Sequence, residues 1–204
     1  YSNLAARIKS NALHKLTPGF VIATKNLFED GLLLESYYNK VMQNAEEIES
    51  IIDYDRDYSF DYFALTTLIR AYLLKFENQT IERPQDLWMR VALTVSGKEF
   101  NLSKIKETYD SLSNGLYTHA TPTLFNSGLK MQQLSSCFLI GMEDDSIEGI
   151  FNTIKDCALI SKTAGGIGMH AHNIRGSGSR IKSTNGKSNG LIPFLKIFNE
   201  TAKS

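Results

Sequence analysis

The order of elements between residues 134 and 174 constrains the fold more than any other feature of this sequence. The segment LSSCFLI, residues 134–140, is short, apolar and flanked by polar turns, which is typical of a buried strand. Helical periodicity follows from Ser146 to Ala164, with Asp145 or Ser146 as the N-cap and Gly165 as the C-cap. A second strand is predicted over IGMHAHNI, residues 167–174. This order is that of a βαβ unit, so we predict parallel strands with a right-handed crossover.

Residues 1–120 have a different, mainly helical pattern. Leu4, Ile8 and Ala12 share one helical face. The run FDYFALTTLIRAYLLK, residues 60–75, is apolar nearly all round, as a buried helix allows. A second face has apolar residues three or four apart: Tyr38, Val41, Ala45, Ile48 and Ile52. The fold class expected is therefore mixed α and α/β, with a helical domain over 1–120 and the βαβ unit within a second domain over 121–204.

Shorter signals refine the helical region. Pro84 suits the first turn of a helix over PQDLWMRVALTV. The polar turn Glu77 to Gln79, inside KFENQTIER, predicts a minor hairpin. A further helix is expected from about Leu102 to Leu112.

Composition excludes several classes of protein. Hydrophobic residues make up 42% of the chain, yet no apolar run approaches the roughly 18 residues that cross a bilayer. Two cysteines are too few for a disulfide framework, which favours a reducing compartment, and no secretory leader opens the chain. We therefore expect a cytoplasmic protein with no membrane contact. Because the chain opens on Tyr1 and stops in helical pattern at Ser204, we also expect a piece of a longer protein.

The C-terminal third is basic and contains a long polar loop. Residues 158–204 hold seven Lys or Arg against one Glu, although the whole chain has a formal net charge of zero. The segment GSGSRIKSTNGKSNG, residues 176–190, is rich in Gly and Ser, and a loop of that length is more often functional than idle. Its glycines leave backbone amides accessible beside Arg175 and Arg180, which suits a phosphate. Two interpretations stay open: an anionic partner, or a solvated basic face.

Two phosphate-loop motifs fail on context. GIGMHA, residues 166–171, fits the dinucleotide fingerprint, but that motif follows a strand and opens a helix, and here the order is reversed. NGKS, residues 185–188, ends like a Walker A loop, yet Ile181 stands where its first glycine belongs. Neither a nicotinamide-binding domain nor a P-loop is therefore predicted.

Candidate metal ligands are also incomplete. Glu143, Asp144 and Asp145 precede the long helix, where acids favour the helix dipole, although a carboxylate there can also accept a ribose hydroxyl. His170 and His172 point to one side of the second strand, a spacing that needs more ligands for a metal. We predict no metal site and favour packing or a polar contact for the histidines.

The two cysteines invite different interpretations. Cys137 lies in the first predicted strand, where it is either an inert packed thiol or a reactive one. Cys157 lies on the apolar side of the long helix, and we interpret it as inert.

These segments occur together in a recognisable order. THATPTLFNSG, QLSSCFLI, DDSIEGIFNTIKDCALISKTAGGIG, IRGSGSRI and TNGKSNGLIPFLKIFN resemble the large subunit of class I ribonucleotide reductase, of the eukaryotic and viral type. Upstream, YSNLAARIKSNALHKLT, IIDYDRDYSFDYF and ERPQDLWMR resemble the helical N-terminal region of that family. The resemblance spans all 204 residues and about a quarter of the family's chain, so the sequence is similar to an N-terminal fragment.

The resemblance implies the start of a ten-stranded α/β barrel over 121–204 and the reduction of ribonucleoside diphosphates to deoxyribonucleoside diphosphates by radical chemistry. Cys137 matches one of the two thiols that reduce the substrate. Thr121, Ser136 and Gly166 match positions that touch the substrate. Because the partner cysteine and the thiyl-radical cysteine of the family lie outside this chain, the fragment alone is expected to be inactive.

The resemblance also implies allosteric nucleotide control. Deoxynucleoside triphosphates or ATP are the expected effectors. Their contacts map onto Asp145, Ser146 and Ile147 for the deoxyribose, Lys162 and Arg175 for phosphates or the neighbouring subunit, and Lys182 and Ser183 in the loop. Lys15 matches a residue at the activity-site nucleotide. Two departures stand out: Arg180 and Lys182 replace residues that are often uncharged, and MHAHN replaces a more apolar strand.

The expected partners follow from the same resemblance. They are the radical-generating small subunit with its di-iron centre, a second large subunit in a homodimer, and thioredoxin or glutaredoxin as reductant. The chain itself is expected to bind no cofactor and no nucleic acid. The alternative is a helical scaffold or interaction module whose basic loop binds RNA or another anion; steep salt dependence would mark polynucleotide binding.

Overall fold

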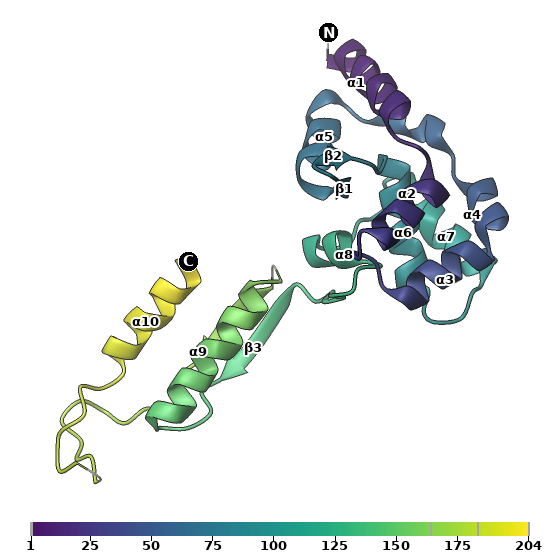
Figure 1. Ribbon diagram of the computed structural model, residues 1–204. Coiled ribbons are helices and arrows are strands. Elements are labelled where there is room, and N and C mark those ends of the chain that lie inside the picture. The colour runs from purple at the N-terminus through teal and green to yellow at the C-terminus, as the bar shows by residue number, and fades with distance from the viewer. Residues whose placement is uncertain (1, 164, 183, 204) are drawn as a thin grey trace. The chain divides into compact units, whose positions relative to one another are not determined.

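The structure is a computed structural model that describes residues 2–163, 165–182 and 184–203. The chain forms two compact units, Tyr1–Leu134 and Ser135–Ser204 (Figure 1). The division follows Leu134 rather than residue 120, where the sequence changes character. Helix α8 (Thr121–Asn126) packs against α6 (Pro84–Val95), and its Leu124 belongs to the core of the first unit.

The first unit is helical. Its remaining elements are α1 (Ser2–Leu16), α2 (Phe20–Glu29), α3 (Glu35–Gln43), α4 (Ala45–Ile51), a 3₁₀ turn (Tyr54–Ser59), α5 (Tyr62–Thr67), a π-helical turn (Leu68–Tyr72), β1 (Lys75–Phe76), β2 (Gln79–Thr80) and α7 (Leu102–Ser113). The predicted hairpin is confirmed: β1 and β2 are antiparallel, and Glu77 and Asn78 have positive φ angles of 48° and 65°. Two positive φ values are what a two-residue hairpin turn of type I′ requires.

Helix α6 is the centre of this unit. Every residue from Pro84 to Leu93 is buried, and α7 packs along it. The side chain of Arg90 is buried with Glu82, with Arg90 Nε 2.6 Å from Glu82 Oε1. Arg90 also donates to the Ser127 carbonyl oxygen at 2.8 Å, so the buried guanidinium is both paired and hydrogen-bonded.

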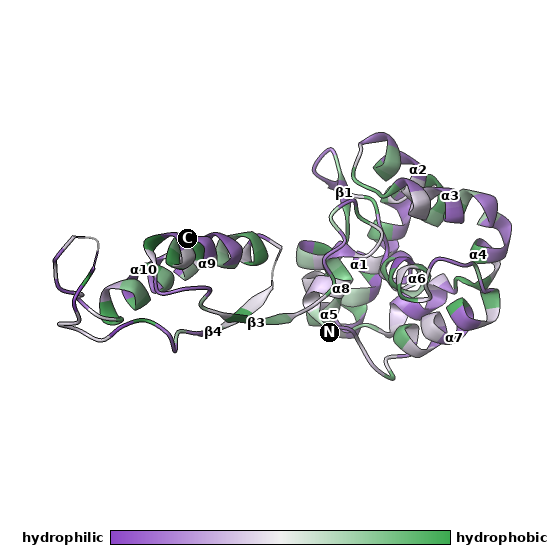
Figure 2. Cartoon of the chain, turned by 90° about the horizontal axis from the view of Figure 1, so that it is seen from below, coloured by the Kyte–Doolittle hydropathy of each residue, from purple (hydrophilic) through white to green (hydrophobic). Residues whose placement is uncertain are grey.

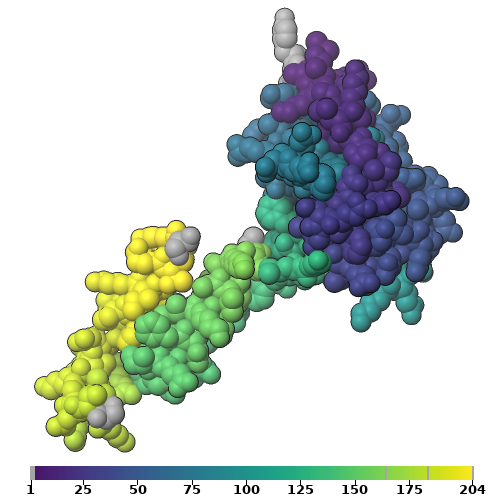
Figure 3. Space-filling model, viewed as in Figure 1, coloured from purple at the N-terminus to yellow at the C-terminus, as the bar shows by residue number. Residues whose placement is uncertain are grey.

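One apolar face of the first unit is exposed, and one helix predicted to be buried is not. Leu4 and Ile8 are 63% and 62% exposed, because α1 packs on its neighbours through Ala6, Ser10 and Leu13 instead. The N-terminal helix is coloured purple in Figure 3. The apolar run at residues 60–75 is not a buried helix either: it divides into α5 and the π-helical turn, and Phe63 is 80% exposed while Leu65 is buried. The apolar face predicted between residues 38 and 52 is confirmed at Val41 and Ile48, which are both buried. It is divided between two helices, because Asn44 separates α3 from α4.

The second unit is the predicted βαβ unit followed by a helix. Strand β3 (Cys137–Gly141), helix α9 (Ile147–Ser161) and strand β4 (Gly166–His170) come in that order, and α10 (Ile192–Lys203) packs against α9. The two strands are parallel, with Cys137 opposite Gly166 and Gly141 opposite His170. The mixed α and α/β fold class is therefore confirmed.

The predicted start of α9 is confirmed, whereas the predicted ends of α9 and β4 are wrong. Ser146 is the N-cap of α9: its Oγ accepts from the Gly149 backbone N–H at 3.0 Å. The helix ends at Ser161 with Lys162 as its C-cap, before Gly165, and β4 ends at His170, before His172. Gly165 serves close packing instead, since a Cβ there would lie 2.7 Å from Ile160 Cγ2 and 2.9 Å from the Phe138 ring.

Strand β3 is not buried as predicted. Its alternate residues Phe138 and Ile140 are half-buried, whereas Cys137 and Leu139 are exposed, Leu139 by 94%. The hydrophobic colouring of β3 in Figure 2 marks this apolar strand. Helix α9 packs on the two-stranded sheet, and the alternate residues Cys137 and Leu139 of β3 are left exposed. No helix in the described part of the chain is long and apolar enough to cross a membrane.

Candidate functional site

Most of the residues predicted to bind an effector line one pocket of the second unit. The pocket has a volume of about 730 Å³ and lies where the start of α9 meets the long polar loop and α10. Five predicted residues line it: Asp145, Ser146, Ile147, Arg175 and Lys182. The other lining residues are Ile150, Ser179, Arg180, Ile181, Ser188 and Phe194.

An ion pair joins two of the predicted ligand-binding groups. Arg175 Nε lies 2.5 Å from Asp145 Oδ2, and Arg175 Nη2 donates to the Asp145 carbonyl oxygen at 3.1 Å. Both side chains are about a third exposed, at 35% and 27%. The pair ties Arg175, five residues after the end of β4, to the residue before the cap of α9. A phosphate on Arg175, or a hydroxyl on Asp145, must therefore compete with this contact.

The loop predicted over residues 176–190 has internal structure. The Gly178 N–H donates to the Ser188 carbonyl oxygen, and the Ile181 N–H donates to that of Gly186, each at 2.8 Å. An antiparallel bridge pairs Arg180 with Lys187. Gly190 closes the loop at a φ of 77°, where a Cβ would lie 2.9 Å from the Ser177 nitrogen. These contacts fold the loop back on itself along one side of the pocket.

The pocket is lined by both basic and apolar side chains. Arg175, Arg180 and Lys182 line it against one carboxylate, that of Asp145. Arg180 donates to Asn185 Oδ1 at 3.1 Å, whereas Lys182 is exposed and has no hydrogen-bond or ion-pair partner within the described residues. Backbone N–H groups at the start of α9 add to the positive potential. Ile147, Ile150, Ile181 and Phe194 supply apolar surface, so the pocket suits a ligand with an anionic part and an apolar or planar part.

A second group of predicted residues meets at the start of the sheet. The Gly166 N–H donates to the Ser136 carbonyl oxygen at 2.8 Å, and Cys137 is opposite Gly166 in the ladder. A Cβ on Gly166 would lie 3.9 Å from Cys137 Sγ, so glycine leaves the thiol uncovered on that side. Cys137 is a free, exposed thiol, which is what a reactive cysteine needs.

Cys157 has the opposite environment. It is buried on α9, and burial, together with the nearby Asp156 carboxylate, raises the pKa of its thiol. A raised pKa keeps the sulfur protonated and less nucleophilic. The burial predicted for this cysteine is therefore confirmed.

Three described site residues lie outside both groups. Thr121 belongs to the first unit, at the start of α8, where its Oγ1 lies 3.4 Å from the Tyr72 hydroxyl. Lys15 is an exposed residue of α1, also in the first unit. Lys162 is at the C-terminal end of α9, at the opposite end of the helix from Ser146. Ser183 lies outside the described residues.

Sequence analysis did not predict that the aromatic residue Phe194 lines the pocket. The amphipathic pattern of α10 was the signal that could have identified it. The histidine pair is in contact as expected for packing: the His170 and His172 rings stack with centroids 4.3 Å apart. No group of three or more metal-ligating side chains is close enough to hold a metal among the residues that the structure describes.

Comparison with known proteins gives a consistent pattern over both units. The sequence family described as ribonucleotide reductase, barrel domain, matches residues 135–204. The family described as ribonucleotide reductase, all-alpha domain, matches residues 58–132. The two matches meet at the division between the compact units.

Curated relatives match along the whole chain. A ribonucleoside-diphosphate reductase large subunit of Arabidopsis thaliana is 47% identical over 213 residues, which cover 100% of this chain and 26% of the relative. The large subunit of Trypanosoma brucei brucei is 44% identical over 218 residues, and the large chain of Cryptosporidium parvum 49% over 212, each with the same coverage. The chain thus spans about a quarter of the length of these relatives.

Proposed function

This chain belongs to the ribonucleotide reductase large-subunit family, and from that premise we propose that it is part of an enzyme that reduces ribonucleoside diphosphates to deoxyribonucleoside diphosphates. Its own contribution is a binding site for an allosteric nucleotide and one of the reducing thiols. The remaining catalytic groups come from residues outside the 204 of this chain.

The observation that carries the proposal is the pocket at the start of α9, which gathers Asp145, Ser146, Ile147, Arg175 and Lys182. A deoxynucleoside triphosphate or ATP has both an anionic part, its phosphates, and a planar part, its base, which are the two parts that this pocket suits. Arg175 and Lys182 bind its phosphates, and charge-assisted hydrogen bonds of this kind are the strong ones. The Asp145 carboxylate accepts a sugar hydroxyl, while Ile147 and Phe194 pack against the base.

Cys137 supplies reducing equivalents in this proposal. Two thiols lose two electrons and two protons as they form a disulfide, while a C–OH bond of the ribose becomes C–H and the oxygen leaves as water. The exposed Sγ of Cys137 next to Gly166 supports its role as one of these thiols. The buried Cys157 is not the second thiol, which lies outside this chain. Ser136, Gly166 and Thr121 contact the substrate.

The partners of the complete subunit belong to the same proposal. They are a small subunit with a di-iron centre that generates the thiyl radical, a second large subunit, and thioredoxin or glutaredoxin, which reduces the disulfide again. The enzyme acts in the cytoplasm. Lys162 and Ser183 contact the effector or the second subunit, and Lys15 contacts a separate activity-site nucleotide.

Calorimetry with dTTP on the full-length large subunit tests the effector site. Arg175→Ala should weaken binding by about 1.5–3 kcal/mol, the usual size of a charged hydrogen bond. Lys155→Ala is the matched control, because Lys155 is an exposed base on α9 that does not line the pocket. Unchanged affinity in Arg175→Ala would overturn the effector assignment.

The basic loop supports a second candidate function, the binding of RNA or another polyanion through Arg180, Lys182 and Lys187. A single-stranded oligonucleotide titrated at 50 and 200 mM salt separates the two functions. Polynucleotide binding loses affinity steeply with salt because counterions are released from the strand. Tighter binding of the oligonucleotide than of dTTP would favour the RNA-binding module.

A further inference from the structure

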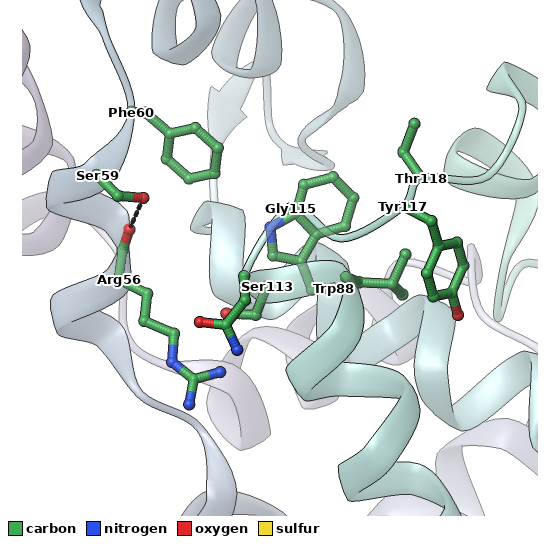
Figure 4. Close-up of a pocket in the computed structure, with 10 residues that line it drawn as sticks. Arg56, Ser59, Phe60, Trp88, Ser113, Gly115, Tyr117 and Thr118 are labelled. Carbon is green, nitrogen blue, oxygen red and sulfur yellow. Dashed lines mark hydrogen bonds between the residues drawn. The ribbon is translucent and has the colours of Figure 1, made fainter.

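The first unit contains a pocket that plays no part in the proposed function. It has a volume of about 510 Å³ and lies between the 3₁₀ turn, α6 and the end of α7 (Figure 4). This volume is within the range of about 300–1,000 Å³ that is usual for small-molecule sites. Its lining residues relevant here are Arg56, Phe60, Trp88, Leu112, Ser113 and Tyr117.

The indole nitrogen of Trp88 is an unsatisfied donor at this pocket. Trp88 is only 7% exposed, and its Nε1 has no hydrogen-bond partner among the described residues. In Figure 4 the nitrogen edge of the ring is turned toward the side of the pocket where Ser59 and Phe60 lie. A buried indole N–H normally finds a partner, since leaving a buried donor unpaired is costly.

A second donor on the same helix is unsatisfied too. Gln85 Oε1 accepts from the Tyr109 hydroxyl at 2.9 Å and from Ser113 Oγ at 2.6 Å. These two bonds fix the amide, and its buried Nε2 is left without a partner within the described residues. Gln85 precedes Trp88 by three residues on α6, so both lie on one face of that helix. Gln85 does not line the pocket, so the donor that the pocket offers to a ligand is Trp88 Nε1–H.

The walls of the pocket are aromatic and carry little net charge. Phe60, Trp88 and Tyr117 contribute rings, which favour a flat ligand. The single cation, Arg56, is already paired: its Nη1 lies 2.8 Å from Asp110 Oδ1 and its Nε 3.2 Å from Asp53 Oδ2. With two carboxylates around the guanidinium, the site does not favour a phosphate.

We propose that this pocket binds a neutral, planar heteroaromatic molecule that places a hydrogen-bond acceptor on Trp88 Nε1–H. The ring of the ligand packs among Phe60, Trp88 and Tyr117. The site is separate from the pocket at Asp145, which belongs to the other compact unit.

The chain offers a direct probe, because Trp88 is its only tryptophan. In the 204-residue chain labelled with ¹⁵N, the single indole N–H resonance reports this site. Benzimidazole and indole are matched ligands, both flat, bicyclic and neutral at pH 8, but only benzimidazole has a ring nitrogen that accepts. Benzimidazole should shift the indole resonance downfield and bind about tenfold more tightly than indole, the effect of one buried hydrogen bond. Equal affinities, or no shift with either ligand, would overturn the proposal.

Two variants and a control locate the contacts. Trp88→Phe keeps a ring but removes the donor, so in ligand-detected titrations it should lose the preference for benzimidazole. Tyr117→Ala removes an exposed part of the wall and should weaken both ligands about fivefold without loss of folding. Phe63→Ala changes an exposed ring outside the pocket and should leave both affinities unchanged. If Trp88→Phe unfolds, Tyr117→Ala decides the question, because unchanged binding in that variant contradicts the site.

Discussion

The guanidinium of Arg175 is held 2.5 Å from the carboxylate of Asp145, Nε to Oδ2, and both residues line the basic pocket. The two residues are 30 positions apart in sequence. In the proposed function Arg175 binds phosphate and Asp145 binds a sugar hydroxyl, so each group is occupied by the other until a nucleotide binds. The ion pair between Arg175 and Asp145 therefore fixes the positions of both side chains when no ligand is bound.

Removal of the carboxylate should separate these two roles. In Asp145→Ala the full-length subunit should bind tripolyphosphate more tightly, because Arg175 is released, while dTTP loses its hydroxyl contact. The ratio of the dTTP affinity to the tripolyphosphate affinity should therefore fall about tenfold, the size of one charged hydrogen bond. Calorimetry with both ligands measures the ratio, and a constant ratio would contradict the hydroxyl contact.

The cap of α9 should contribute to stability on its own. Ser146→Ala removes the oxygen that accepts from the Gly149 N–H and should cost about 0.5–2 kcal/mol. Hydrogen exchange of the Gly149 amide should accelerate, as measured by NMR or mass spectrometry. Ser161→Ala, at the exposed end of the same helix, is the matched control and should change little. Similar losses in both variants would mean that Ser146 is not a significant cap.

The two thiols should differ in function. Cys137→Ser in the full-length subunit should fold and bind effector but form no deoxynucleotide in a single turnover of the pre-reduced enzyme without external reductant. The reason is that a hydroxyl cannot become part of a disulfide. Cys157→Ser should retain most of the product, since its buried sulfur is not used. A wild-type yield from Cys137→Ser would remove Cys137 from the chemistry.

Asp86 should make stability depend on pH. Burial raises the pKa of its carboxyl to about 7, although hydrogen bonds from the Arg83 backbone N–H and the Tyr54 hydroxyl act to lower it. A folded pKa above the unfolded value means that the native state holds the proton more tightly. The contribution of the Asp86 carboxyl to the free energy of unfolding is thus fully present below about pH 4, and it is lost as the pH rises to about 7.

Asp86→Asn does not titrate and provides the reference for this effect. The free energy of unfolding of the wild type, minus that of the variant, should fall between pH 5 and pH 7 and stay level above pH 8. Urea unfolding followed by the fluorescence of Trp88 reports the unit that contains Asp86. A difference that does not change with pH would show that the buried carboxyl is ionised throughout.

Local patterns predicted the elements well and their exposed faces less well. The hairpin at Glu77 and Asn78 follows from a turn signal of a few residues, and the parallel β3 and β4 follow from the order of strand, long helix and strand. Leu4 and Ile8 have the apolar spacing of one helical face, yet that face is exposed and α1 packs through Ala6 and Leu13. Periodicity identifies an apolar stripe, but it does not identify the surface that covers it.

The sequence by itself determined the fold class, the order of the βαβ unit, the N-cap of α9 at Ser146 and, through its joined motifs, the family. Only the tertiary structure decided that Arg175 pairs with Asp145, that Cys137 is exposed while Cys157 is buried, and that Trp88 turns an unpaired N–H toward a pocket. The physical reason is the distance along the sequence between the residues that interact. Propensity, capping and periodicity depend on residues within about one helical turn, whereas these contacts depend on how α9 packs on the sheet and on how α6 packs with α7.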